Sequence, residues 1–168
     1  MSVGDTATPS DRLTPEAAMR EALALAARNV DKGDGGPFGA VVVRDGKVVA
    51  RGWNQVTSTN DPTAHAEVVA IRRACAALGT FSLAGCELYA SCEPCPMCLA
   101  ASYWARVDRI YFSGTRQQAA HAGFSDEDIY LEIPRALEER TLPTRVLLPE
   151  AGQGPFDAWL TKADRIPY

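Results

Sequence analysis

Hydrophobic positions follow two periods along this chain, and each change of period marks a new element. An apolar stripe with helical spacing begins after Thr14 and ends at the glycine-rich stretch 31–36, which predicts an N-terminal helix. Two runs of β-branched residues then flank Asp45 and Gly46, a strong turn pair. This pattern predicts a β-hairpin over 39–54.

Beyond the hairpin, helical and extended patterns alternate to the end of the chain. We predict a helix that follows Asp61-Pro62 and lasts to about Gly79, a strand at 86–91, a helix at 95–105, a strand at 109–114, an acidic helix near 125–140, a strand at 144–149 and a last helix at 155–163. This order is typical of one α/β domain with helices on both faces of a sheet. Because the hairpin is antiparallel, the five predicted strands form a mixed sheet. We place this domain at 14–168 and predict a flexible tail at 1–13.

The composition is that of an ordinary globular protein. The chain has 168 residues, of which 46% are hydrophobic and 23% charged, so it can bury a core and is unlike a disordered or fibrous protein. No apolar run reaches the ~18–20 residues that cross a bilayer, and the N-terminus lacks the features of a signal peptide, so we expect a cytoplasmic protein without membrane contact. The net charge of −4 argues against an extended nucleic-acid surface.

Metal-ligating residues gather in two short stretches, each predicted at the N-terminal end of a helix. Cys95 and Cys98 are one helical turn apart, so their sulfur atoms can converge on one point, and His65 supplies a nitrogen ligand. Two thiolates and one imidazole leave a tetrahedral zinc ion one open position, which is typical of a catalytic site. The other histidine, His121, could fill that position but lies in a loop-like stretch.

An acidic residue accompanies the histidine ligand. Glu67 lies two residues after His65, in the first turn of its predicted helix, where its side chain can reach the open side of the metal. A carboxylate that is not itself a ligand is a candidate general acid–base for a bound water. A solvated helix glutamate is the ordinary alternative, but it leaves the pairing of His-x-Glu with Pro-Cys-x-x-Cys unexplained.

Two other kinds of site use the same cysteines. Cys92, Cys95 and Cys98 open a bacterial iron–sulfur motif, yet that motif needs a fourth cysteine where this chain has Ser102. A thioredoxin-like dithiol also uses Cys-x-x-Cys but leaves His65 without a role. We therefore expect one zinc ion per chain, and we expect Cys92 to end a strand rather than to ligate.

The motif "HAE" at 65–67 and "PCPMC" at 94–98 resembles that of the cytidine-deaminase-like superfamily. This resemblance implies a three-layer α/β/α fold. Other stretches resemble the bacterial guanine deaminases in particular: "GGPFGAVVV" (35–43), "GWNQVTSTNDPTAHAEVVAIRRAC" (52–75), "LYASCEPCPMCLAASYWAR" (88–106), "AGFSDEDIYLEI" (122–133), "EERTLP" (138–143) and "PFDAW" (155–159). The resemblance covers most of the chain beyond residue 14.

The resemblance also implies roles for individual residues. His65, Cys95 and Cys98 would hold zinc, Glu67 would shuttle protons, Phe38 would form an aromatic wall for the purine, Asn54 would hydrogen-bond its edge, Trp104 and Tyr168 would close the pocket, and Asp126 would recognise or deprotonate the guanine amine. Core packing explains the three aromatic residues equally well without the family. Glu127 and Asp128 are neighbouring alternatives to Asp126.

Together these features predict zinc-dependent hydrolysis of guanine to xanthine and ammonia. The resemblance further implies a homodimer in which a segment of about 115–168 is exchanged between chains, with a hinge expected at 112–123. Deamination of guanosine or another aminated heterocycle stays an open alternative. A tRNA adenosine deaminase and a non-catalytic zinc or iron–sulfur module are two more.

Overall fold

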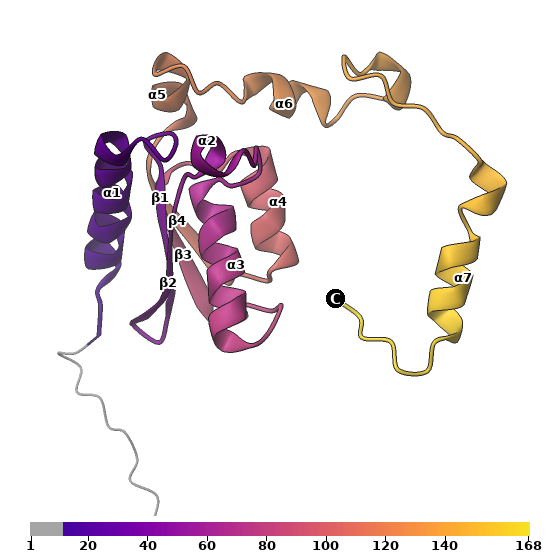
Figure 1. Ribbon diagram of the computed structural model, residues 1–168, viewed down its shortest axis with the longest axis horizontal. Helices are drawn as coiled ribbons and strands as arrows, with labels where there is room; N and C mark the ends of the chain where they lie inside the picture. The colour runs from indigo at the N-terminus through magenta and orange to yellow at the C-terminus, as the bar shows by residue number, and fades with distance from the viewer. Residues whose placement is uncertain (1–11) are drawn as a thin grey trace, which may run out of the picture. The chain divides into compact units, whose positions relative to one another are not determined.

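A mixed β-sheet lies between helices in the larger part of the protein (Figure 1). The structure is a computed structural model that describes residues 12–168. The chain divides into two units, one ending at Asp126 and the other formed by Glu127–Tyr168, and the sheet belongs to the first. Its strand order is β2-β1-β3-β4.

The first unit contains four strands and five helices among the described residues. The strands are β1 (Gly39–Arg44), β2 (Lys47–Trp53), β3 (Cys86–Cys92) and β4 (Arg109–Gly114). The helices are α1 (Pro15–Lys32), α2 (Val56–Thr59), α3 (Ala66–Leu78), α4 (Pro96–Trp104) and α5 (Arg116–His121). Strand β1 pairs antiparallel with both β2 and β3, whereas β3 and β4 are parallel to each other and are joined by α4. The predicted mixed sheet is confirmed.

The predicted ends of α1 are confirmed by its caps. The hydroxyl of Thr14 accepts a hydrogen bond of 3.2 Å from the amide of Ala17, and Pro15 occupies the first turn, where no amide hydrogen is needed. The helix ends at Gly33, whose positive φ of 72° suits a residue without Cβ. The predicted hairpin is also confirmed, since Asp45 and Gly46 both take positive φ angles.

Two hydrophobic cores lie on opposite faces of the sheet and make the three layers. One core joins Ala22 and Leu25 of α1 to Val41 and Val43 of β1. The other joins α3 to the alternate side chains of the same strands, including Val42 and Leu88. Because successive strand side chains point to opposite faces, the unbroken apolar run of β1 serves both cores. The three-layer α/β/α architecture is therefore confirmed.

Helix α3 lies close to strand β2 because a glycine stands between them. A Cβ added to Gly52 would lie 2.1 Å from the carbonyl oxygen of Ala66 and 2.6 Å from the amide nitrogen of Ala70. Both atoms belong to the backbone of the first turns of α3, so neither can move aside by a change of rotamer. This contact sets the position of the helix end that carries His65 and Glu67.

The prediction of a fifth strand is wrong. Residues 144–149 form no strand in the structure and make no ladder hydrogen bonds within the described chain, so the sheet has four strands. A strand is stable only beside a partner strand, and the extended sequence pattern cannot supply one. The acidic helix predicted near 125–140 is reduced to α6 (Glu127–Glu132) and a 3-10 turn at Leu137–Glu139, with Pro134 between them.

Some boundaries also differ from the predictions. Residues 112–123, where a hinge is expected, contain the end of β4 and all of α5, whose Thr115 and Gln118 form a capping box, and the hinge itself stays a prediction. Helix α3 begins at Ala66 rather than directly after Asp61-Pro62. The predicted flexible tail lies outside the described residues up to position 11, but Leu13 packs against the α1 core, so the folded domain includes it.

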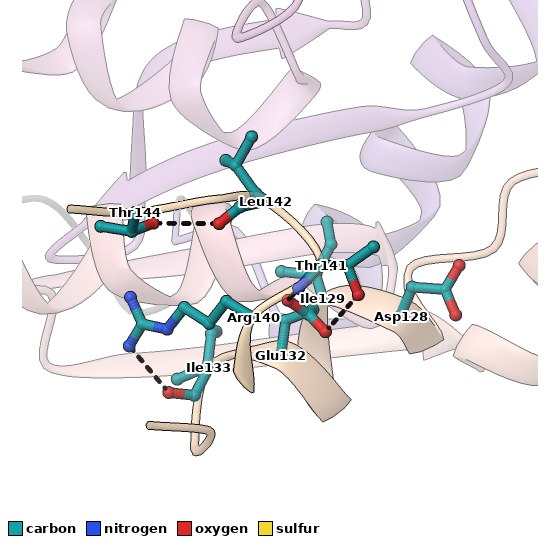
Figure 2. A pocket seen from close by; sticks show the side chains of 8 residues that line it. All are labelled: Asp128, Ile129, Glu132, Ile133, Arg140, Thr141, Leu142 and Thr144. Carbon is teal, nitrogen blue, oxygen red and sulfur yellow. Dashed lines mark hydrogen bonds between the residues drawn. The ribbon is translucent and has the colours of Figure 1, made fainter. Parts of the chain in front are cut away.

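The second unit contains short elements and no buried residue. It comprises α6, the two 3-10 turns Leu137–Glu139 and Pro149–Ala151, and α7 (Gly154–Thr161), which confirms the predicted last helix. The side chain of Glu132 accepts hydrogen bonds from the amide and hydroxyl of Thr141, at 2.7 and 2.9 Å, and folds the chain back beside α6 (Figure 2). These residues line an open hollow of about 600 Å³ whose surface is mainly apolar.

No helix among residues 12–168 is both long enough and apolar enough to cross a membrane.

Gly52→Ala should weaken the first unit, because the added methyl group meets two backbone atoms that cannot yield. Overpacking of this kind costs about 1–3 kcal/mol of unfolding free energy. We expect a lower Tm in thermal unfolding, together with lower zinc content, since the displaced turn carries His65. Gly154→Ala is the matched control, because a Cβ there has no neighbour within 4 Å. An unchanged Tm in Gly52→Ala would show that the close approach is not needed.

Candidate zinc and purine site

The metal-ligating residues lie at the N-terminal ends of α3 and α4. His65 is the N-cap residue of α3 and Cys95 is the N-cap residue of α4, with Cys98 in the first turn that follows. Neither N-cap side chain makes a capping hydrogen bond, although capping is the usual use of that position. The two side chains are therefore turned toward each other instead of toward their own helices.

The three ligand atoms have the spacing of a tetrahedral zinc site. The Nδ1 atom of His65 lies 3.5 Å from the Sγ atom of Cys95 and 3.5 Å from that of Cys98. A tetrahedral ion with Zn–N of about 2.0 Å and Zn–S of about 2.3 Å requires N···S separations of about 3.5 Å. All three ligand atoms lie within 4.8 Å of one another, and within residues 12–168 they form the single such group. The donor set and its geometry fit zinc.

The thiols also show the electrostatics of a metal site. Hydrogen bonds from Cys98 and then from His65 lower the pKa of Cys95 to about 4, so Cys95 is a thiolate at neutral pH. The same contact with Cys95, together with burial, raises the pKa of Cys98. Without a cation the pair therefore keeps one proton, and a bound divalent ion would release it.

Glu67 is buried beside this group. Its side chain is only 7% exposed, and burial is the main cause that raises its pKa, with the charge of Cys95 adding to the effect. Glu67 also lies close enough to Cys98 for a hydrogen bond between their side chains. A buried carboxyl group beside the metal ligands, with its pKa raised by burial, has the position and the direction of pKa shift expected of a general acid–base. The structure thus places Glu67 where the sequence predicted it.

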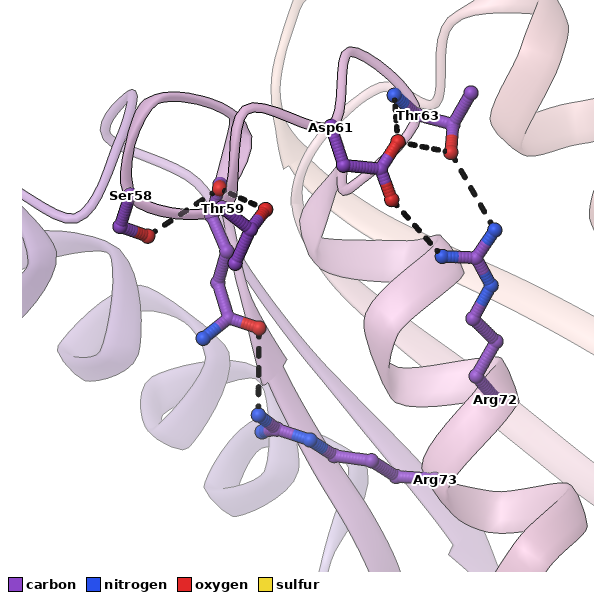
Figure 3. A network of polar contacts seen from close by, with 7 residues as sticks. Ser58, Thr59, Asp61, Thr63, Arg72 and Arg73 are labelled. Carbon is purple, nitrogen blue, oxygen red and sulfur yellow. Dashed lines mark hydrogen bonds and ion pairs between the residues drawn. The ribbon is translucent and has the colours of Figure 1, made fainter.

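A polar network that the sequence analysis missed holds the chain just before His65 (Figure 3). One carboxylate oxygen of Asp61 accepts hydrogen bonds from the amide and hydroxyl of Thr63, at 2.8 and 2.6 Å, and the other pairs with Arg72 at 3.3 Å. The contacts with Thr63 are the main cause that lowers the pKa of Asp61. The Thr63 carbonyl in turn accepts the amide of His65 at 2.8 Å. The Asp-Pro-Thr sequence is an available signal for this turn.

Two of the predicted purine-binding residues are neighbours at the same end of the sheet. The amide of Asn54 donates to the carbonyl of Phe38 at 3.1 Å, so the residues that follow β2 and precede β1 are joined. The Phe38 ring meets the ring of Phe124 edge-on, with centroids 5.1 Å apart. Phe124 is an aromatic neighbour that the sequence analysis did not single out.

Asp126 lies within electrostatic range of the metal ligands. Burial is the main cause that raises its pKa, and the charge of Cys95 contributes in the same direction. Its charge in turn raises the pKa of His65, although less than the hydrogen bond that the His65 ring donates to Cys95 does. Glu127, the alternative considered from the sequence, is exposed and begins the second unit.

The two remaining aromatic candidates are exposed. Trp104 ends α4 with 66% of its surface exposed, and Tyr168 in the second unit is 74% exposed. Trp104 lies at the opposite end of α4 from Cys95 and Cys98. Their predicted roles in closing the pocket stay predictions.

Cys92 and His121 lie outside the ligand group. The thiol of Cys92 contacts the carbonyl oxygen of Thr115 at 3.6 Å, and Cys92 ends β3 as the sequence predicted. His121 belongs to α5. The hydroxyl of Ser102 donates to the Cys98 carbonyl at 2.8 Å within α4. This arrangement gives no fourth thiolate for an iron–sulfur cluster.

Residues 13–114 match the family described as the cytidine and deoxycytidylate deaminase zinc-binding region. The chain belongs to this deaminase family. Zinc is therefore its cofactor, and His65, Cys95, Cys98 and Glu67 all lie inside the matched range.

Relatives of the deaminase extend the match to nearly the whole chain. Guanine deaminase of Bacillus subtilis is 50% identical over 153 residues, which cover 91% of this chain and 98% of that protein. The X-ray structure of guanine deaminase from Bacillus subtilis has a TM-score of 0.91 at 49% identity and covers 93% of this chain and 99% of that one.

Two other deaminases match smaller parts of the chain. A tRNA-specific adenosine deaminase of Agrobacterium fabrum is 48% identical over 92 residues, which are 55% of this chain and 60% of that protein. A solved structure of guanine deaminase from Nitrosomonas europaea has 33% identity and a TM-score of 0.65, covering 75% of this chain and 69% of that one. Both guanine deaminases therefore match a larger share of this chain than the tRNA-specific adenosine deaminase does.

Removal of either cysteine ligand should release zinc from the deaminase. Cys95→Ala and Cys98→Ala each leave two ligands, so we expect most of the metal and all deamination to be lost. Cys92→Ala is the matched control, since its sulfur contacts a carbonyl oxygen and not the ligand group. Zinc per chain, measured by mass spectrometry of the purified variants, separates the two cases. Equal zinc loss in Cys92→Ala would mean that the ligand set is wrongly assigned.

Proposed function

We propose that this protein catalyses the hydrolytic deamination of guanine to xanthine and ammonia. The observation that carries the proposal is the ligand group of His65, Cys95 and Cys98, whose spacing leaves a tetrahedral ion one open position beside the buried carboxyl group of Glu67. The relative that matches nearly the full length of the chain is a guanine deaminase, which supports guanine as the substrate.

Proton transfer is assigned to Glu67. When bound, zinc supplies a Lewis acid that makes a water molecule nucleophilic near neutral pH. The Glu67 carboxylate takes a proton from the water that attacks C2 of guanine and delivers it to the adjacent ring nitrogen. A second proton passes through the same carboxyl group to the departing amine. One water is consumed, ammonia leaves, and xanthine remains.

Phe38 and Asn54 are assigned to hold the purine. The Oδ1 atom of Asn54 already accepts hydrogen bonds from the amides of Gly36 and Val56, at 3.1 and 3.2 Å. Its Nδ2 group makes no hydrogen bond to any residue in the part of the chain that the structure describes, so it is available to an acceptor on the purine edge. The edge-on packing of Phe124 fixes the Phe38 ring as a flat wall.

Asp126 is assigned to the donor edge of guanine. The N1–H and 2-amino groups of guanine both donate hydrogen bonds, and a carboxylate accepts them, whereas the corresponding edge of adenine presents an acceptor at N1. The raised pKa of Asp126 fits a carboxyl group that also exchanges a proton with the substrate. This residue gives a physical reason to prefer guanine over adenine.

Of the two alternative substrates, tRNA is disfavoured by the charge of the chain, whereas guanosine is left to the assay. A tRNA adenosine deaminase needs a basic surface, yet residues 124–140 hold six acidic residues against two arginines, and the Agrobacterium relative matches only 55% of the chain. Guanosine differs from guanine only by its ribose, and its deamination is tested in the same assay. The cytoplasmic location stays a prediction.

A homodimer with exchanged C-terminal units is part of the proposal. No residue of Glu127–Tyr168 is buried, although this unit carries apolar side chains throughout: Ile129, Leu131, Ile133, Leu137, Leu142, Val146, Leu147, Leu148, Phe156, Leu160 and Ile166. A segment of this size cannot bury enough apolar surface to be stable by itself. Strand β4 is an edge of the sheet, and the unpaired residues 144–149 have a strand-like pattern. A second copy of the chain would give the β4 edge and residues 144–149 a strand partner each.

The first unit carries exposed aromatic residues that a second copy could also cover. On α4, Tyr103 and Trp104 are 77% and 66% exposed, and Phe112 on β4 is 48% exposed. Such side chains are enriched where protein chains meet. In this arrangement the C-terminal Tyr168 of one chain closes the pocket of its partner.

The main test of the function is ammonia release across a panel of guanine, guanosine, adenine, cytosine and cytidine, with Glu67→Gln beside the unsubstituted protein. We expect release from guanine, and a loss of several orders of magnitude in kcat for Glu67→Gln with zinc retained, since each proton transfer contributes ~10²–10⁴-fold. Activity on adenine or cytidine alone would refute guanine as the substrate. Near-normal turnover of Glu67→Gln would assign the proton shuttle to another group.

The exchanged dimer is tested by mixing two inactive proteins. Glu67→Gln and a chain lacking Pro167 and Tyr168 are unfolded together and refolded with zinc. If the units are exchanged, a mixed dimer holds one site with an intact Glu67 and an intact partner tail, so activity returns. If each tail closes the pocket of its own chain, every site stays defective. Each protein refolded alone is the control.

A further inference from the structure

An asparagine of α1 links the two segments that form the purine side of the site. Asn29 is only 1% exposed and lies near the C-terminal end of the helix, which carries none of the predicted site residues. Its Nδ2 group donates one hydrogen bond to the carbonyl of Gly36 at 2.8 Å and another to the carbonyl of Asn54 at 2.9 Å. Both amide hydrogens are thus used on backbone atoms outside α1, one seven and the other 25 residues further along the chain.

The two carbonyls belong to residues that already orient the Asn54 side chain. The amide of Gly36 donates to the Oδ1 atom of Asn54, and the amide of Asn54 donates to the carbonyl of Phe38. Asn29 therefore closes a ring of contacts in which Gly36 and Asn54 are held at a fixed separation. With Oδ1 fixed by the Gly36 amide, the Nδ2 end of Asn54 must face the other way.

The loop before β1 is packed tightly against Asn54. A Cβ added to Gly35 would lie 2.2 Å from the Oδ1 atom of Asn54 and 2.7 Å from its carbonyl oxygen. The backbone therefore passes directly over the Asn54 carboxamide. If the link to Asn29 is cut, the loop can move away from the carboxamide. The Oδ1 atom of Asn54 then keeps only the Val56 amide as its donor, and the direction of the Nδ2 group is less tightly set.

The Asn29 side chain is used for its donors and not for its acceptor. The Oδ1 atom of Asn29 is the one buried side-chain oxygen or nitrogen within residues 12–168 that has no hydrogen-bond partner. A buried acceptor without a partner destabilises the folded state, and the carbonyl of Gly36 also accepts the Phe38 amide. The useful part of this side chain is its pair of N–H donors, aimed at the substrate-binding segments.

We propose that Asn29 is a positioning residue for purine recognition, acting through Asn54 without touching the substrate. The inference rests on the proposed role of Asn54. A group that acts only through another has no effect once that other group is removed. This property separates a positioning role from a general contribution to folding.

The experiment compares Asn29→Ala, Asn54→Ala and the double variant with guanine as substrate. Loss of Asn29 should raise KM by about 5–30-fold, as expected for misplacing one hydrogen-bond donor in the site, with kcat changed much less and zinc retained. The double variant should have the KM of Asn54→Ala alone. Asn29→Asp keeps the shape and removes the amide donors, so it should also raise KM. It provides the same comparison if Asn29→Ala does not fold.

Leu25→Ala is the matched control, since Leu25 is a buried residue one turn earlier on α1 and packs in the core. It should lower Tm and leave KM unchanged. The inference is overturned if the two single variants add in the double variant, or if KM stays normal without Asn29 while Asn54→Ala raises it. A normal KM in Asn54→Ala overturns the proposed role of Asn54 and the inference with it.

Discussion

The site depends on one geometric constraint: the N-terminal ends of α3 and α4 must bring the Nδ1 atom of His65 and the Sγ atom of Cys95 to within about 3.5 Å of each other. His65 and Cys95 are 30 residues apart and cap different helices, yet their ligand atoms must hold this separation to within a few tenths of an ångström to bind a tetrahedral ion. The sheet provides the rigidity. Gly52 lets α3 approach β2 so closely that its first turns contact the strand backbone, and α4 is held as the crossover between the parallel strands β3 and β4.

The same convergence explains why a carboxyl group can be kept buried beside two thiols. Glu67 follows His65 in the first turn of α3, so the position that the ligand requires also places the carboxyl group near Cys98. Burial raises its pKa, while the partial positive charge of the helix end offsets part of the cost of a negative group. The histidine ligand and the proposed proton shuttle therefore share one turn of α3, and a shift of that turn would displace both.

The part of the fold that follows from local sequence was accessible without the structure. The Asp45-Gly46 hairpin, the capped start of α1 and the spacing of Cys95 and Cys98 each depend on neighbouring residues, and each is found where the pattern places it. The missing strand at 144–149 shows the limit, since its pattern is extended but its pairing requires another chain segment. The ion pair of Asp61 with Arg72 and the hydrogen bond from Asn29 to the Asn54 carbonyl are likewise invisible to periodicity, because each joins residues of different segments.

The ligand geometry has a consequence for the energetics of the chain as well as for its chemistry. An ion bound to His65, Cys95 and Cys98 cross-links positions 30 residues apart, and so restricts the unfolded chain much as a disulfide would. Closing a loop of this size is worth about 3–4 kcal/mol in the chain-entropy estimate. The bound metal would thus stabilise the first unit, and we expect its removal by a chelator to lower the melting temperature as well as the turnover. Thermal unfolding of a preparation can therefore serve as a gauge of how fully it is metallated.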